Sequence, residues 1–316
     1  MFDQVFFRKM VLLAKLESDY ATDPTLTGAA NAILGTDIAL RPMEGQDVAR
    51  NLIRDYLSGE ATIPAGLHVI IEFSTELAGS GTAGTAPGWG PLMRGCGCAE
   101  VIVANTSVTY TPISEDMESL YIKFWLGDTL HALKGARGDA TISLDAQGIP
   151  RIRWTFTGLW VAPAEVSRPA ATLTGFKKPK IAAAANTPTF ELNSVALALR
   201  SWSLKLGNKV EPRLLVNVEK IIITDRAEAL DCTVEVTPLA ATCRHRAGVP
   251  FGGIAMADKL ACTSHTQELT RSSSDTRSDA SQRLRDATDN FYQDVATVGD
   301  RQHFWGRANG TVGSGG

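Results

Sequence analysis

The sequence predicts a mainly β fold, an antiparallel β-sandwich or barrel with one or two short helices. The first observation is strict alternation: Ile152, Trp154 and Phe156 are separated by polar residues. A period of two gives a strand one buried and one exposed face, which is typical of antiparallel sheets. The second is that turn residues separate the alternating runs, and the third is that helix signals are few.

The alternation recurs between residues 30 and 240. The other runs are Leu67–Phe73, Leu120–Leu126, Ala140–Leu144, Leu192–Leu199, Trp202–Leu206 and Leu230–Val236. The turn signals are Gly127-Asp128, Gly135–Gly138, Ala146–Gly148, Gly207-Asn208 and Thr224-Asp225. The stretch Leu215–Ile223 is denser in β-branched residues, which indicates a strand buried on both faces.

Two segments carry helix signals. Val48–Leu57 follows Asp47, a residue suited to capping a helix N-terminus, and Trp89–Arg94 is long enough for one short turn. We therefore expect these two short helices beside the strands.

The chain divides near residue 240. Residues 1–240 form the predicted β domain, within which residues 163–188 hold four prolines and the basic cluster Lys177–Lys180. A stretch of this length without regular structure is usually functional or a linker, so we expect an extended arm lying on another surface. In residues 241–316 the alternation is lost, which predicts a polar segment, partly disordered or weakly helical.

Composition excludes several classes of protein. The 316 residues include 44% hydrophobic and 21% charged residues, as in a globular protein, and the net charge of −3 does not suggest a protein that grips nucleic acid through phosphates. We expect no membrane span and no secretory signal. Five cysteines without framework spacing indicate folding in a reducing cytoplasm.

A glycine-rich loop, Glu76–Gly97, follows the strand Leu67–Phe73. Gly79, Gly81 and Gly84 have the spacing of a dinucleotide fingerprint, which requires a full helix and a parallel partner strand to follow. Pro87 and Pro91 oppose such a helix, so the loop is interpreted as mobile and we assign no cofactor.

Other candidate sites have structural interpretations. Cys243, His245, Cys262 and His265 have ligand types suited to structural zinc, but they are more simply four scattered residues. Cys96 and Cys98 are interpreted as packed thiols. The acidic cluster Glu115–Glu118 is expected to be a solvated strand end, with a patch that lines an internal channel or binds a metal as the alternative. His68 and His131 suggest no triad, so no catalytic residue is assigned and no enzyme is expected.

Taken in order, several phrases between residues 5 and 240 resemble the siphophage major tail tube protein. They are Phe7–Met10, Ala14-Lys15, Thr27–Ala32, Met43–Asp47, Glu76–Gly97, Thr109–Pro112, His131–Gly138, Phe156–Leu159, Asn186–Phe190 and Leu206–Asn208. After about Leu239 the chain departs from that family.

The resemblance implies a β-sandwich subunit that assembles into stacked, six-fold rings, forming a hollow tube through which DNA passes without sequence-specific binding. It implies contacts with copies of itself and with tape measure, tail terminator and distal tail proteins, in a virion tail assembled in the bacterial cytoplasm. The loop at 41–67 and the arm at 163–188 are expected to make the inter-ring contacts. An immunoglobulin-like binding or tail-decoration module remains the alternative.

Overall fold

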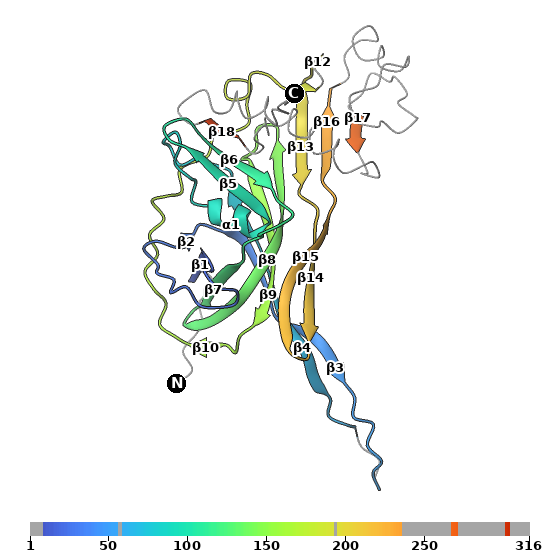
Figure 1. The fold of residues 1–316 in the computed structure, drawn as a ribbon. Coiled ribbons are helices and arrows are strands. Elements are labelled where there is room, and N and C mark those ends of the chain that lie inside the picture. The colour runs from blue at the N-terminus through green and yellow to red at the C-terminus, as the bar shows by residue number, and fades with distance from the viewer. Residues whose placement is uncertain (1–8, 56–58, 193–194, 236–266, 271–300, 304–316) are drawn as a thin grey trace, which may run out of the picture.

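Most of the strands belong to one large antiparallel sheet (Figure 1). The computed structural model describes residues 9–55, 59–192, 195–235, 267–270 and 301–303. The eleven strands of this sheet are β1 (Met10–Leu16), β2 (Ala32–Ile33), β3 (Thr36–Val48), β4 (Ile63–Glu76), β7 (Leu120–Leu126), β8 (Thr129–Asp145), β9 (Arg151–Trp160), β10 (Ala164–Glu165), β13 (Leu199–Lys205), β16 (Ala229–Val234) and β17 (Gln267–Thr270).

The remaining strands form three smaller groups. These are the hairpin of β5 (Cys98–Val103) and β6 (Ser107–Pro112), which β18 (Arg301–His303) joins in parallel, the pair β11 (Glu191–Leu192) and β12 (Val195–Ala196), and the hairpin of β14 (Asn208–Leu215) and β15 (Val218–Arg226). With a single short helix, α1 (Gly90–Gly95), among the described residues, the architecture confirms the predicted mainly β fold.

Strand β8 is the centre of the large sheet. Along one edge it pairs first with β7 and then, beyond Ala140, with β13. Its other edge pairs with β9, which continues the sheet through β4 to β3. The seventeen residues of β8 therefore connect two groups of strands that do not pair with each other.

The alternation predicted from sequence places the core. Ile152, Trp154 and Phe156 are fully buried, and the same face of the sheet carries Ile142 and Phe73. Helix α1 and the β5–β6 hairpin cover this face through Leu92, Met93, Val108 and Tyr110, which share one apolar cluster with the sheet. Because each such side chain loses its contact with water on folding, its burial contributes about 1.5–3 kcal/mol to the free energy of unfolding.

Helix α1 is short because proline and glycine frame it. Pro91 stands at its first turn, where its missing N–H would have no helical partner, and Gly95 lies against Leu120 and Phe156, where a side chain would clash. Trp89, immediately before the helix, is buried and donates from Nε1 to the Ala78 carbonyl at 2.9 Å. The predicted helix at Trp89–Arg94 is thus confirmed.

The second predicted helix, Val48–Leu57, is wrong for residues 48–55, and its last two residues lie outside the described part of the chain. Val48 is the last residue of β3, and residues 49–55 form an irregular connection toward β4. Val48, Leu52 and Ile53 are exposed, so the apolar spacing does not mark a face packed on the core. Helical stability in proteins comes mainly from packing an apolar face, and here that packing is absent.

Two of the predicted turns lie inside strands. Gly135–Gly138 belongs to β8, where a register shift between Lys134 and Arg137 marks a bulge and Gly135 has a φ of 59°. Thr224-Asp225 lies near the end of β15. The turn-forming residues at these two places form a bulge and a strand end. Their composition correctly indicated irregular backbone, but the predicted chain reversals are wrong.

One hairpin extends beyond the packed body of the sheet, and a second lies against strands β8 and β9. The β3–β4 hairpin projects away from it at the lower right of Figure 1, and β14–β15 continues from β13 and β16 after breaks at Gly207 and Ala227-Glu228. The prediction that Leu215–Ile223 is buried on both faces is wrong: Ile221 is buried, but Leu215, Val216 and Val218 are exposed. Its β-branched residues reflect strand propensity without double burial.

Residues 163–188 run along the protomer's own β domain. Ala164 and Glu165 pair with β8, Thr172 donates its N–H to the Gly28 carbonyl at 2.9 Å, and Phe176 packs against the main core. The segment is mostly irregular, and its contacts are to strands and loops of the same chain. Contact with the surface of another subunit stays a prediction.

We expect Asn208→Ala to lower the free energy of unfolding by about 2 kcal/mol, because it leaves buried carbonyl groups without a hydrogen-bond donor. The Asn208 Nδ2 group donates to the Cys96 and Gly138 carbonyls at 2.7 and 2.9 Å, and its Oδ1 accepts from Arg226. Urea unfolding followed by tryptophan fluorescence measures the loss. Lys209→Ala, at the exposed next residue, is the control, and equal stabilities for the two variants would contradict the assignment.

Candidate functional site

The face of the large sheet opposite the core is polar where β3, β4 and the first half of β9 lie side by side. Alternation places Ser74 and Glu72 of β4 on it, opposite the buried Phe73, and the register sets Arg153 and Thr155 of β9 beside them. Strand β3 adds Arg41 to the same face. A sheet face of this kind interacts with water or with a polar ligand, because it offers little apolar area to bury.

Opposite charges on this face lie in contact. Arg41 Nη2 lies 3.1 Å from Glu72 Oε1, and Arg153 Nη2 lies 2.6 Å from Glu72 Oε2. Arg151 Nη1 lies 3.4 Å from Asp37 Oδ2. These three arginine side chains thus meet carboxylates from other strands of the sheet.

The projecting part of the β3–β4 hairpin exposes large apolar side chains. Ile53 is 102% exposed, and Met43, Val48, Leu52 and Ile63 are each about half exposed. These residues lie together along one extension of the fold, whereas exposed apolar residues on monomeric proteins are usually scattered singly. The segment has the chemistry of a contact surface.

The β14–β15 hairpin presents a second exposed apolar tip, formed by Leu215, Val216 and Val218. Its middle is held rigidly. The Tyr20 hydroxyl accepts from the Ile221 N–H at 2.6 Å, and Arg137 donates to the carbonyls of Ile221 and Met117 at 3.3 and 2.7 Å. Burial raises the pKa of Tyr20 and lowers that of Arg137.

The bulge in β8 is held from the N-terminal side by Glu17. Its carboxylate accepts from the Gly135 N–H at 2.7 Å, from the Ser119 hydroxyl at 2.5 Å and from the Ala21 N–H at 2.9 Å. A carboxylate that accepts several donors at once fixes the backbone around it. The strand is therefore bent at a defined place, next to the hairpin contact made by Arg137.

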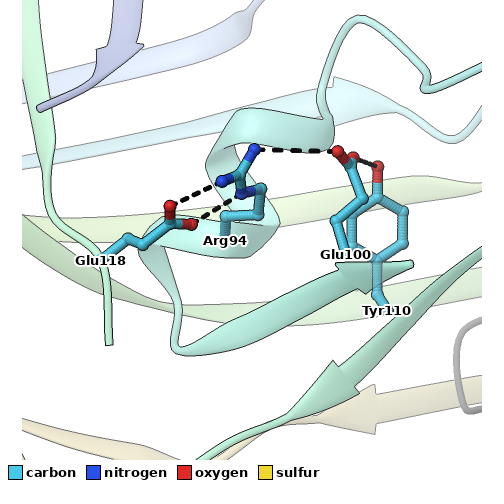
Figure 2. Close-up of polar contacts among 4 residues, drawn as sticks. All are labelled: Arg94, Glu100, Tyr110 and Glu118. Carbon is cyan, nitrogen blue, oxygen red and sulfur yellow. Dashed lines mark hydrogen bonds and ion pairs between the residues drawn. The ribbon is translucent and has the colours of Figure 1, made fainter. Parts of the chain in front are cut away.

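Arg94 clamps helix α1 between two acidic residues (Figure 2). Its Nε and Nη2 donate to the Glu118 carboxylate at 2.6 and 2.5 Å, and Nη1 lies 3.8 Å from Glu100. The hydrogen bond to Glu118 raises the pKa of Arg94. The Tyr110 hydroxyl donates to Glu100 at 2.5 Å, and burial raises its pKa well above the usual range.

This clamp revises the interpretation of the acidic cluster Glu115–Glu118. Glu118 is an ion-pair partner of the helix and not simply a solvated strand end, while Asp116 has a φ of 53° in the turn before β7. Within the part of the chain that the structure describes, no group of three or more His, Cys, Asp or Glu residues is placed to hold a metal ion.

The glycine-rich loop lacks the geometry of a dinucleotide site. The strand before it, β4, pairs antiparallel with both β3 and β9, and the helix after it has only six residues. Gly84, with a φ of 69°, packs against the backbone of the β5–β6 turn near Asn105, where a side chain would clash. The glycine therefore serves a close backbone approach.

The sequence-predicted cysteine and histidine candidates are dispersed. Cys96 and Cys98 are buried, and burial raises the pKa of Cys98 to about 12 and that of Cys96 above its usual value. His68 and His131 lie on different strands, β4 and β8, and burial lowers the pKa of His131. The zinc candidates Cys243, His245, Cys262 and His265 lie outside the described residues.

The comparisons with known proteins give one family. A family model described as phage tail tube protein matches residues 8–238. The chain belongs to the phage tail tube protein family. A search of curated proteins finds no match. The matched range includes the β domain through β16 and ends where the sequence was expected to depart from the family.

Membership in the tail tube family assigns a structural role in the phage tail. The family implies self-association in general, for which exposed apolar hairpins are suitable surfaces. None of the helices among the described residues has the length and apolar character needed to cross a membrane. Sequence reasoning assigned no contact to Glu72, Arg94, Glu17, Tyr20 or Arg137. Each acts through a partner far away in the chain, which becomes visible only when the strand register is known.

We expect Glu118→Gln to lower the stability of the tail tube subunit by about 1 kcal/mol, because it removes a bidentate, charge-assisted pair that is only partly exposed. Chemical denaturation measures the change. Glu115→Gln is the control, since Glu115 is exposed and makes no ion pair with any described residue. A loss of the same size in both variants would show that the Arg94 contact is not responsible.

A second test concerns the thiols. In a variant carrying Cys243→Ser and Cys262→Ser, the remaining Cys96, Cys98 and Cys232 should react slowly with DTNB at about pH 8 while the protein is folded, because only the thiolate is nucleophilic. Burial places the folded pKa of Cys98 and Cys232 at about 12, above the ordinary 9.0, so ionisation comes only as the pH approaches the higher value. All three should react rapidly in guanidinium; fast reaction of the native protein would be inconsistent with this burial.

Proposed function

We propose that this tail tube family member assembles into stacked, hexameric rings that form a hollow conduit for DNA. The observation that carries the proposal is the β3–β4 hairpin, which projects from the sheet and exposes Met43, Val48 and Ile53 (Figure 1). A neighbouring ring would cover these side chains, and burying each would contribute about 1.5–3 kcal/mol. Residues 41–67 are therefore the proposed inter-ring contact.

Backbone pairing supports closure of a ring. Within the described part of the chain, β3 pairs on one edge only, with β4, which leaves a long row of main-chain donors and acceptors on its other edge. Open edges of this length favour pairing with another chain, and a closed ring satisfies every edge with a copy of the same protein. The exposed tip Leu215–Val218 offers additional apolar area for such contacts.

The polar face of the sheet suits the inside of the tube. A conduit must release the DNA that passes through it, and each unmasked Lys or Arg contact to phosphate adds affinity through counterion release. The face carries serine and threonine beside paired charges, and the chain has a net charge of −3. DNA would therefore slide past this face without sequence-specific binding.

The same proposal extends to partners and location. Tape measure, tail terminator and distal tail proteins would contact the ends or the interior of the tube, and assembly would take place in the bacterial cytoplasm before the tail joins the virion. Residues 1–240 would form the assembling domain, and residues 241–316 would be a separate, atypical segment. Residues 163–188 would add inter-ring contacts only on the side that faces away from their own protomer.

The test is the size and shape of the purified full-length protein. Rings or hollow cylinders should appear in negative-stain images at micromolar concentrations, and light scattering should give the mass of six copies or a multiple of it. A stable monomer over the same concentrations would contradict the proposal and favour a tail-decoration module.

Ile53→Asp tests the hairpin contact. It places a charge in the proposed inter-ring surface, so stacked cylinders should disappear while single rings persist, because burying an unpaired carboxylate is strongly unfavourable. Ile149→Asp, at an exposed apolar residue between β8 and β9, is the matched control and should leave stacking intact. Unchanged cylinders for Ile53→Asp, or loss of stacking in both variants, would overturn the assignment of residues 41–67.

A further inference from the structure

One carboxylate on the polar face holds two arginines. Glu72 lies on β4 between Arg41 of β3 and Arg153 of β9, and each of its oxygens is within 3.1 Å of one guanidinium. The Glu72 side chain is 19% exposed, whereas those of Arg41 and Arg153 are 58% and 66% exposed. The cations therefore stand at the surface, and the carboxylate sits beneath them.

The strand register explains this arrangement. Arg41 pairs with Ile70 and Arg153 pairs with Ser74, the two residues that precede and follow Glu72 on the same face of β4. Both arginines therefore reach Glu72 diagonally, from opposite sides and from opposite directions along the strand, a distance that long side chains can span. Three neighbouring strands are needed to build the group.

Its contribution to stability is small. Ion pairs with a largely exposed cation contribute little to the free energy of unfolding, so the fold can lose them without unfolding. The chemical effect is larger: the guanidinium groups that bind a carboxylate in this geometry are the same groups that bind phosphate. With Glu72 in place, the three charges sum to +1 and both guanidinium groups are engaged by its carboxylate; without it, the sum is +2 and both guanidinium groups would be open to a polyanion.

We propose that Glu72 is a charge-masking residue, which prevents Arg41 and Arg153 from binding the phosphates of DNA at this face. The inference rests on the proposed function, because DNA passing through a tube is the polyanion that would meet the face. Ring symmetry would repeat the pair of arginines in every subunit, so loss of the mask would create a positive belt. Asp37 would mask Arg151 in the same way, at 3.4 Å, but the Asp37 side chain is 72% exposed, whereas that of Glu72 is 19% exposed.

The test compares DNA binding of full-length variants. Glu72→Gln keeps the shape of the side chain and removes its charge. With a short fluorescent DNA duplex in low salt, fluorescence anisotropy should show binding at least about tenfold tighter than wild type. The logarithm of affinity should fall more steeply with the logarithm of salt concentration, by about 0.9 for each freed arginine that contacts a phosphate.

Matched variants separate masking from the simple loss of a negative charge. Glu76→Gln changes the net charge equally on the same face of β4, at a residue that makes no ion pair with any described residue, and should bind DNA as wild type does. The triple variant Arg41→Gln, Glu72→Gln, Arg153→Gln should also return to wild-type binding. Asp37→Asn, which frees Arg151 alone, should give a smaller gain and a smaller change in slope.

The masking role would be overturned if folded Glu72→Gln protein, checked by circular dichroism, bound DNA no better than Glu76→Gln, or if the triple variant kept the gain. Electron micrographs of the same samples test the proposed function separately. A gain in DNA binding without rings or cylinders in any sample would uphold the masking chemistry and reject the tube. Cylinders in all samples without any gain would uphold the tube and reject the masking role.

Discussion

Strand β8 changes partners half-way along its length, just after the bulge at Gly135. As far as Ala136, β8 pairs with β7; after Ala140 it pairs with β13. Between these partners, a stretch of the β8 edge has no strand beside it, so its backbone N–H and C=O groups need other hydrogen-bond partners. Asn208 occupies part of it by donating to the Gly138 carbonyl, and Asp139 accepts from the Asn208 N–H at 2.9 Å. Because these groups are buried, losing any of them leaves an unpaired polar atom, which makes the junction specific.

The same junction directs the hairpin that leaves the sheet. Arg226 bonds the carbonyls of Cys96 and Gly97 after helix α1, and Tyr20 meets the middle of β15. The base of the hairpin is thus tied to the helix, the N-terminal region and the central strand together, while its tip carries Leu215 and Val216 outward. A rigid base holds the apolar end in one orientation. Such a surface is suited to binding a copy of the same chain, because little conformational entropy is lost in ordering it on association.

Much of the fold was predictable because the core is built from alternating strands. The runs around Trp154, Ile142 and Trp202 each bury the predicted face, since period-two patterning reports directly on a half-buried strand. Predictions failed where the same residue types serve a different role. Gly135–Gly138 has turn composition but forms a bulge, and Val48–Leu57 has helical spacing but no surface to pack against. The candidate site could not be predicted in the same way. Glu72, Arg41 and Arg153 come from three separate strands, and only the register brings their charges together.

The burial of the described cysteines affects how the subunit withstands oxidation outside the host cell. Cys96, Cys98 and Cys232 are enclosed by packed side chains, and burial keeps their thiols protonated. On the proposed assembly in the bacterial cytoplasm, the tail would pass from a reducing cell to surroundings that oxidise exposed thiolates. Because oxidants and other sulfhydryls act on accessible thiolates, these sulfur atoms should survive that passage chemically unaltered, and the durability of the subunit outside its host would need no covalent cross-link through them.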